Sequence, residues 1–180
     1  MDPALVQEYY TTDYIEALPE GERAELIDGK LYMMASPSVL HQDIITFLTM
    51  KIGNCIEEHN KGCKLNVSPI AVYINNDKYN YVEPDLIVVC DPEKRKEKGI
   101  FGAPDFVVEI VSPSSIQMDY LRKMIKYANS GVREYWIVDP LIKKTRVYNF
   151  ETEYTEDVPF NEDIHAGICE ELTVNLTEFI

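Results

Sequence analysis

Hydrophobic and polar positions of this chain alternate in short stretches and recur at helical spacing in longer ones. Residues 24–27 and 30–33 are two short, largely apolar runs on either side of Asp28 and Gly29. An Asp-Gly pair between apolar runs favours a tight hairpin, because both turn positions need positive φ. The sequence therefore predicts a β-hairpin over 24–33.

Two longer segments have the apolar periodicity of helices. The first follows Ser36-Pro37-Ser38 and should continue for about 20 residues, ending before Gly62. The second follows 112–115, where serines and a proline end a strand and supply a cap. It should end near Gly131, which suits the position after a helix because glycine has no Cβ.

The remaining apolar runs predict strands. They are residues 65–74, with an edge or bulge at Pro69, and residues 81–89, 106–111, 134–139, 145–150 and 172–176. Strands interspersed with at least two helices predict an α/β or α+β fold, with a mixed central sheet flanked by helices. A chain of 180 residues fits one domain, so we expect residues 1–180 to form a single unit.

Composition narrows the class of protein. Apolar residues make up 46% of the chain, as in ordinary globular proteins. The amino terminus lacks the basic region and apolar stretch of a secretory signal. Every apolar run is far shorter than the ~20 residues of a membrane helix. We expect a soluble, cytoplasmic protein with no membrane partner.

The cysteines are expected to be reduced thiols. Cys55, Cys63, Cys90 and Cys169 form no C-x-x-C pair, and the chain has only three histidines to complete a zinc site. Without an export signal, free thiols are the simpler expectation. A structural zinc site is not expected.

Net charge argues against strong binding to nucleic acid. The formal charge is −14, although residues 147–180 contain nine acidic residues and no Lys or Arg, so that residues 1–146 carry only −5. Bases cluster at 94–98, 122–126 and 143–146. The field can therefore be locally positive, but nonspecific affinity for DNA should be weak and sensitive to salt.

Two carboxylates interrupt apolar runs and are the candidates for chemistry. Asp85 stands within Glu-Pro-Asp-Leu-Ile-Val-Val, and Glu109 lies within Phe-Val-Val-Glu-Ile-Val. An acid in a central strand is costly unless it is paired or coordinates a cation. On neighbouring strands the two would converge on one hard cation, with the Ile110 carbonyl as a third ligand, and such oxygen sites suit Mg²⁺ or Mn²⁺. The alternative is that each acid pairs with a base at the end of a sheet.

A lysine on the following helix completes this constellation. Asp119, Lys123 and Tyr127 are spaced four residues apart, so they share a helical face. Because the helix follows directly from the strand of Glu109, Lys123 could return over the carboxylates and orient water or stabilise charge on phosphate. The alternative is an exposed Asp119–Lys123 pair of small energetic value.

Several motifs together point to a known family. They are residues 25–31, 36–38 with His41, 84–86, 103–105, 108–114, Asp119, Lys123, Tyr127 and 131–140. With these motifs the chain resembles, over nearly its whole length, the large bacterial family of putative restriction endonucleases, long labelled a domain of unknown function, in the PD-(D/E)XK nuclease superfamily. The resemblance implies a restriction-endonuclease-like core with a divalent metal at Asp85 and Glu109.

One position departs from the superfamily pattern. Where the motif has Lys two positions after the acid, this chain has Val111. In the resembled family the lysine is moved to the next helix, where Lys123 stands. A long flexible stem can present the same ammonium from another backbone position. The departure also means that retained activity does not follow from the resemblance.

Other polar residues are weaker candidates. Glu25 either faces the metal or neutralises a surface base, and His41 either caps and packs a helix start or helps to activate water. We expect structural roles in turns and caps for Asp105, Asp139, Ser112 and Ser114.

Three functional hypotheses follow. The leading one is a metal-dependent DNA endonuclease that uses Asp85, Glu109 and Lys123. The alternative is a catalytically idle nuclease fold that binds nucleic acid or a protein partner, which the negative charge favours. The third is a subunit of a larger assembly, and twelve tyrosines could also serve a homodimer interface.

Overall fold

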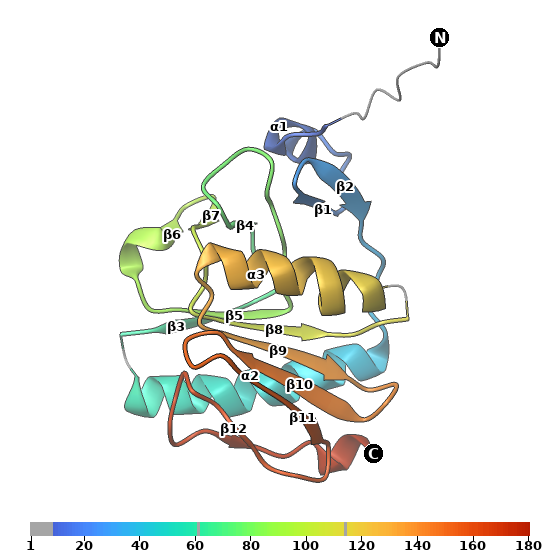
Figure 1. Cartoon of the computed structure of the whole chain (residues 1–180). Helices are drawn as coiled ribbons and strands as arrows, with labels where there is room; N and C mark the ends of the chain where they lie inside the picture. Colours follow the sequence, from blue (N-terminus) through green and yellow to red (C-terminus); the bar gives the residue numbers. More distant parts are fainter. Residues whose placement is uncertain (1–8, 61, 114) are drawn as a thin grey trace.

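The computed structural model describes residues 9–60, 62–113 and 115–180 (Figure 1). Ser114, expected to have a structural role, and residues 1–8, used in the argument against a secretory signal, lie outside the described residues. Within the described residues, no helix combines the length and the apolar character needed to cross a membrane.

A six-stranded mixed sheet forms the centre of the fold. Its strands lie in the order β11-β10-β9-β8-β5-β3. Their bounds are Lys64–Val67 for β3, Leu86–Val89 for β5, Phe106–Ile110 for β8, Glu134–Asp139 for β9, Lys144–Asn149 for β10 and Tyr154–Pro159 for β11. Only β8 and β9 pair in parallel in this sheet. The expected mixed sheet flanked by helices is confirmed.

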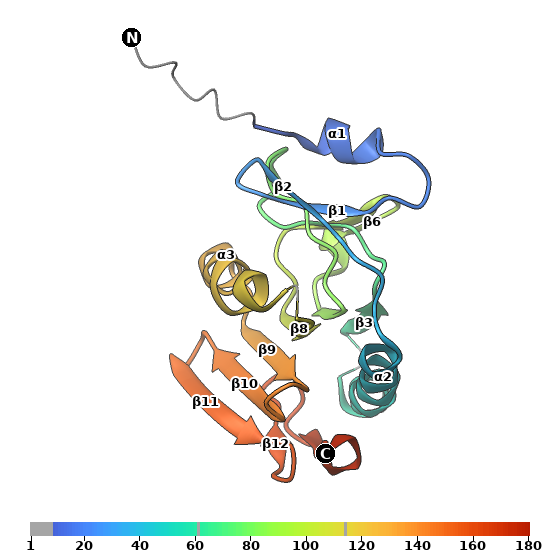
Figure 2. The same cartoon turned by 90° about the vertical axis from the view of Figure 1, so that its right-hand side faces the viewer.

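Helices cover the two faces of this sheet (Figure 2). The long helix α2 (Val39–His59) packs on one face, and α3 (Met124–Ser130), preceded by the π-helical segment η2 (Met118–Lys123), packs on the other. Alternation along the strands fills both interfaces: Leu86 belongs to the α2-side core and Ile87 to the α3-side core. Central strands buried on both faces explain the continuous apolar runs.

The predicted hairpin and helix ends are present. Strands β1 (Ala24–Ile27) and β2 (Lys30–Met33) pair around Asp28 and Gly29, whose φ values are 50° and 76°. Ser38 caps α2, because its side chain accepts a hydrogen bond from the backbone N–H of His41. Gly131 ends α3 with φ of 96°.

Three of the expected strands are shorter than predicted, and the expected strand 172–176 is reduced to β13 (Thr173–Val174). The run 65–74 is split at Pro69, so that β3 joins the central sheet and β4 (Val72–Tyr73) joins a small sheet with β7 (Gly99–Phe101) and β6 (Arg95–Lys96). The run 81–89 becomes β5 only from Leu86, after isolated bridges at Tyr81 and Val82. Pro84 lies between these bridges and β5 and has no N–H to donate to a ladder.

Short elements complete the described chain. They are α1 (Thr12–Glu16), η1 (Pro92–Lys94), β12 (Ile164–His165), β13 (Thr173–Val174) and η3 (Thr177–Phe179). The last three belong to the acidic carboxyl-terminal segment, residues 147–180. This segment supplies Ile164, Leu172 and Val174 to the α2-side core.

The expectation of four reduced thiols was wrong for this structure. Cys55 pairs with Cys169, and Cys63 pairs with Cys90, as disulfides. The first pair is separated by 114 residues and the second by 27. Spacing along the chain carries no sign of such pairs. Cys55 meets Cys169 where α2 packs against the segment after His165, and Cys63 and Cys90 flank the paired strands β3 and β5.

Candidate active site

A groove opens between the β1–β2 hairpin, the start of α2 and the ends of two central strands. Its volume is about 1040 Å³. All the site residues predicted from the sequence line it: Glu25, His41, Asp85, Glu109, Ile110 and Lys123. Asp119 and Val111 line it as well.

Asp85 and Glu109 lie on the same face of neighbouring strands. Strand β5 pairs with β8 with Leu86 opposite Val108, and Asp85 is the residue immediately before β5. One step further along this antiparallel register places Asp85 opposite Glu109, with both side chains toward α3. Asp85 Oδ2 accepts a hydrogen bond of 2.7 Å from the backbone N–H of Ile110, which fixes its orientation.

Lys123 enters the site from η2. Its Nζ lies 2.9 Å from Glu109 Oε1, 2.9 Å from Glu25 Oε1 and 3.7 Å from Asp119 Oδ1. Asp119 and Lys123 are only 2% and 4% exposed, so the alternative of an exposed surface pair was wrong. Tyr127 lies on the same helical face and donates a 2.8 Å hydrogen bond from its hydroxyl to Glu109 Oε1.

Glu25 is a buried member of this network. Besides contacting Lys123, it accepts a hydrogen bond from the backbone N–H of Glu83. The Glu83 carboxylate is in turn held by the Tyr81 hydroxyl and the Arg23 guanidinium. The alternative that Glu25 only neutralises a base at the surface was therefore wrong. Sequence reasoning missed the supporting residues, because nothing local links positions 23, 81 and 83.

His41 contacts the Asp85 member of the carboxylate pair. Its Nε2 lies 3.2 Å from Asp85 Oδ2, and its Nδ1 is buried with no hydrogen-bond partner among the described residues. A proton on Nδ1 would be a buried donor without an acceptor, so the favoured tautomer has its hydrogen on Nε2, toward Asp85. This geometry suits a residue that positions Asp85.

Acidic charge exceeds basic charge in the buried part of the site. The carboxylates of Glu25, Glu109 and Asp119 face the Lys123 ammonium, and Asp85 adds a fourth carboxylate beside Glu109. Burial raises the pKa of Glu109 well above its usual value; Lys123 opposes this shift, while the neighbouring acids add to it. For Asp119, burial raises the pKa to about 6 against the opposing effects of Lys123 and a hydrogen bond with Ser115.

The donor atoms fit a hard divalent cation. Asp85 and Glu109 offer carboxylate oxygens, and the excess negative charge favours a cation beside them. Mg²⁺ is typically held by one or two carboxylates, while water and substrate phosphates fill its other positions. A pair of carboxylates at the floor of an open groove meets this requirement.

Val111 occupies the position where the superfamily motif has a lysine, and this position is buried. It lies two residues after Glu109 and is 3% exposed in the α3-side core. Lys123 brings its ammonium to Glu109 from η2 instead, which agrees with the departure noted in the sequence.

Several bases of the predicted clusters are paired with acids. Arg146 contacts both Asp157 oxygens at 2.6 and 2.7 Å, and Lys126 lies 2.5 Å from Asp28. Lys123 is buried in the site. Pairing reduces the positive field available to a phosphate backbone, so the expectation of weak affinity for DNA is retained.

Comparison with known proteins now decides the family. Residues 6–177 match the family Uma2, described as "Putative restriction endonuclease". The chain belongs to this family. The resemblance seen in the sequence is thereby confirmed, and a nuclease-like function is supported.

One relative of this Uma2 chain matches it in sequence, and one solved structure matches it in fold. An uncharacterised protein of Synechocystis sp. (strain PCC 6803) is 31% identical over 129 residues, which are 71% of this chain and 66% of that relative, so the match spans just under two thirds of its length. A crystal structure from Anabaena variabilis, titled as a putative nuclease of DUF820, superposes with a TM-score of 0.76. That comparison has 21% identity and covers 94% of this chain and 96% of the other, and it shows the shared fold.

Proposed function

We propose that this Uma2 protein is a Mg²⁺- or Mn²⁺-dependent DNA endonuclease that hydrolyses phosphodiester bonds. The observation that carries the proposal is the placement of Asp85 and Glu109 on one face of neighbouring strands, with the Lys123 ammonium against Glu109. Family membership supports a nuclease; the metal and the DNA substrate are our inference.

Existing contacts suggest which oxygens would hold the ion. Asp85 Oδ2 accepts a hydrogen bond from the Ile110 N–H. Glu109 Oε1 accepts hydrogen bonds from the Lys123 ammonium and the Tyr127 hydroxyl. The opposite oxygens, Asp85 Oδ1 and Glu109 Oε2, are therefore the candidate ligands. The N–H and C=O of one residue point to the same side of a strand, so the Ile110 carbonyl also faces Asp85. When bound, the cation would polarise a phosphoryl oxygen and lower the pKa of an attacking water.

Protein groups would supply orientation and charge. The carboxylates around Lys123 raise its pKa well above the usual value despite burial, so it stays an ammonium. That fixed positive charge would orient water and offset negative charge that develops on the phosphate. His41 would keep Asp85 in place, and Tyr127 would keep Glu109 in place.

Cleavage of DNA tests this proposal directly. Supercoiled plasmid and a short duplex would be incubated with purified protein and Mg²⁺ or Mn²⁺ at low salt. We expect nicking or cutting that requires the metal and disappears in Asp85→Asn and Glu109→Gln. Asp91→Asn, an exposed acid after β5, is the matched control and should keep wild-type activity. Wild-type protein that binds DNA and never cleaves it would overturn the enzyme proposal.

The alternative is a catalytically idle nuclease fold that binds nucleic acid or a protein. Paired bases and a Lys123 shared among several carboxylates favour it. Calorimetric titration with Mn²⁺ separates the two: binding that is lost in Asp85→Asn supports the enzyme, whereas no metal affinity supports the idle module. A single domain over 1–180, a homodimer and a cytoplasmic location stay predictions.

A further inference from the structure

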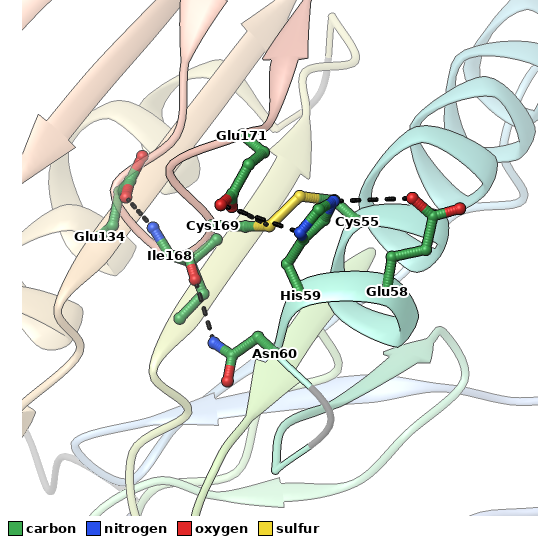
Figure 3. The surroundings of a disulfide bond; sticks show 8 residues. All are labelled: Cys55, Glu58, His59, Asn60, Glu134, Ile168, Cys169 and Glu171. Carbon is green, nitrogen blue, oxygen red and sulfur yellow. Dashed lines mark hydrogen bonds and ion pairs between the residues drawn. A yellow bond between two sulfur atoms is a disulfide. The ribbon is translucent and has the colours of Figure 1, made fainter.

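The Cys55–Cys169 disulfide lies among other metal-ligating side chains, outside the groove. Cys55 and His59 come from the last turns of α2, whereas Cys169 and Glu171 come from the segment between β12 and β13 (Figure 3). Ligand atoms of Cys55, Cys169 and Glu171 all lie within 4.8 Å of one another. In the part of the chain that the structure describes, no other group of three such residues is as close.

His59 lies beside this group of three and contacts Glu171. It follows Cys55 by four residues, so the two share a helical face. Its Nδ1 lies 3.8 Å from Glu171 Oε1, and its Nε2 lies 3.6 Å from Glu58 Oε2 (Figure 3). A carboxylate on the second ring nitrogen is the usual device that orients a zinc-bound histidine.

We propose that reduction of this disulfide converts the cluster into a tetrahedral Zn²⁺ site. The four ligands would be Cys55, His59, Cys169 and Glu171. Two thiolates, an imidazole and a carboxylate are all ligands that zinc accepts, and four of them close a structural site. The side chains of His59 and Glu171 are 43% and 56% exposed, so they can turn toward the sulfurs without repacking the core.

The chemistry of the conversion is a thiol–disulfide exchange. A dithiol reductant gives two electrons and two protons to the Cys55–Cys169 bond, which breaks into two thiols while the reductant becomes a disulfide. Zn²⁺ then displaces the two thiol protons and is held by the thiolates. Reducing compartments keep thiols reduced, so the metal form belongs to a reducing environment and the disulfide form to an oxidising one.

In either form the cluster would tie the end of α2 to the acidic carboxyl-terminal segment. That segment closes the α2-side core, and the opposite end of α2 carries His41 at the groove. The other disulfide provides a contrast within the same chain, because Cys63 and Cys90 belong to no such group of ligands among the described residues. Its reduction should create no zinc site.

Cobalt spectroscopy tests the proposal. The protein used carries Asp85→Asn, which removes one of the metal ligands proposed in the groove. It is reduced with a phosphine, freed of reductant under anaerobic conditions and titrated with Co²⁺. We expect one Co²⁺ per chain, with the intense visible and near-ultraviolet bands of tetrahedral thiolate coordination, and displacement by Zn²⁺. Zn²⁺ should also protect Cys55 and Cys169 from alkylation, as peptide mass analysis would show.

Variants separate the four ligands from the rest of the chain. Cys55→Ser and Cys169→Ser should abolish the thiolate bands, whereas the double variant Cys63→Ser, Cys90→Ser should retain them. Because His59 and Glu171 are partly exposed, His59→Ala and Glu171→Ala keep the test valid if a buried cysteine variant fails to fold. Both should weaken Zn²⁺ binding.

The orienting role of the Glu58 carboxylate is tested by comparing variants of Glu58 and of its neighbour Glu57. Glu58→Gln should weaken Zn²⁺ binding by about 10- to 100-fold. Glu57→Gln should leave it unchanged, because Glu57 is directed to Lys64 instead. No tetrahedral bands in the reduced protein, or bands that persist in both Cys55→Ser and His59→Ala, would overturn the proposal.

Discussion

The Lys123 ammonium and the Glu109 carboxylate form a buried ion pair of 2.9 Å between η2 and β8. The same ammonium is also 2.9 Å from Glu25 in the hairpin. One cation therefore joins the sheet, the helix that follows it and the hairpin that walls the groove. Its loss should affect folding and chemistry together.

Lys123→Met should be strongly destabilising and should abolish most of the proposed activity. It leaves Glu25 and Glu109 buried without their cation, at a cost of about 3–5 kcal/mol in the free energy of unfolding. The proposed DNA cleavage should fall about 10²- to 10³-fold, the effect of removing one fixed electrostatic stabiliser. Urea unfolding and plasmid cleavage measure the two effects.

Lys126→Met is the control for that substitution. Lys126 is on the same helical segment and pairs with Asp28; their side chains are 12% and 69% exposed, so water reaches this pair from the Asp28 side. Exposed pairs contribute about 0–1 kcal/mol, so stability should change little and cleavage should be kept. Equal losses in the two lysine variants would contradict the assigned role of Lys123.

Tyr127→Phe should lower the free energy of unfolding by about 1.5–3 kcal/mol, the value of a hydrogen bond to a charged group. Burial raises the pKa of Tyr127 well above its usual value, so the phenol stays protonated and its hydroxyl donates a hydrogen bond to Glu109. The ring contact with Tyr135 is retained in the variant. Chemical denaturation is the measurement. In Tyr154→Phe, which loses a solvent-exposed hydrogen bond to Glu156, stability should stay within about 0.5 kcal/mol of wild type.

Stability without divalent metal should fall as the pH rises toward 6, partly because of Asp119. Burial raises the pKa of this carboxyl from 3.8 to about 6 in the folded protein, with Lys123 opposing and Glu25 and Asp85 adding to the shift. Between these two values the folded chain holds a proton that the unfolded chain has lost. The folded state is therefore favoured at the acidic end of this window, and this contribution is lost as the pH passes the folded pKa.

Asp119→Asn removes this titration. Urea unfolding of both proteins in a metal chelator, from pH 4.5 to 7.5, should give a stability difference that shifts in favour of the variant as the pH rises. Parallel curves over the whole range would show that Asp119 does not titrate as described.

Gly131→Ala should cost about 1–2 kcal/mol, the penalty for a Cβ in left-handed backbone. The φ of Gly131 is 96°, and a Cβ built there meets no atom within 4 Å, so backbone conformation alone would cause the loss. Gly62 has equal space without positive φ, and Gly62→Ala should be neutral or slightly stabilising in the same thermal unfolding assay. A loss at Gly62 as large as that at Gly131 would refute this explanation.

Local elements were predictable because their causes are local. The Asp28-Gly29 turn, the Ser38 cap and the Gly131 helix end each depend on a few adjacent residues, and each is present. The Leu65–Ile74 run was only partly correct, because Pro69 does not reveal which of two sheets each half joins.

Residue types and spacing determined by themselves which elements form, which carboxylates interrupt apolar runs, and which family the chain resembles. Only the tertiary structure decided that Glu25 and Asp119 share Lys123 with Glu109, that His41 contacts Asp85, and that the four cysteines pair. Each of these outcomes joins residues from separate elements, and packing of apolar faces, rather than any local preference, sets the distance between them.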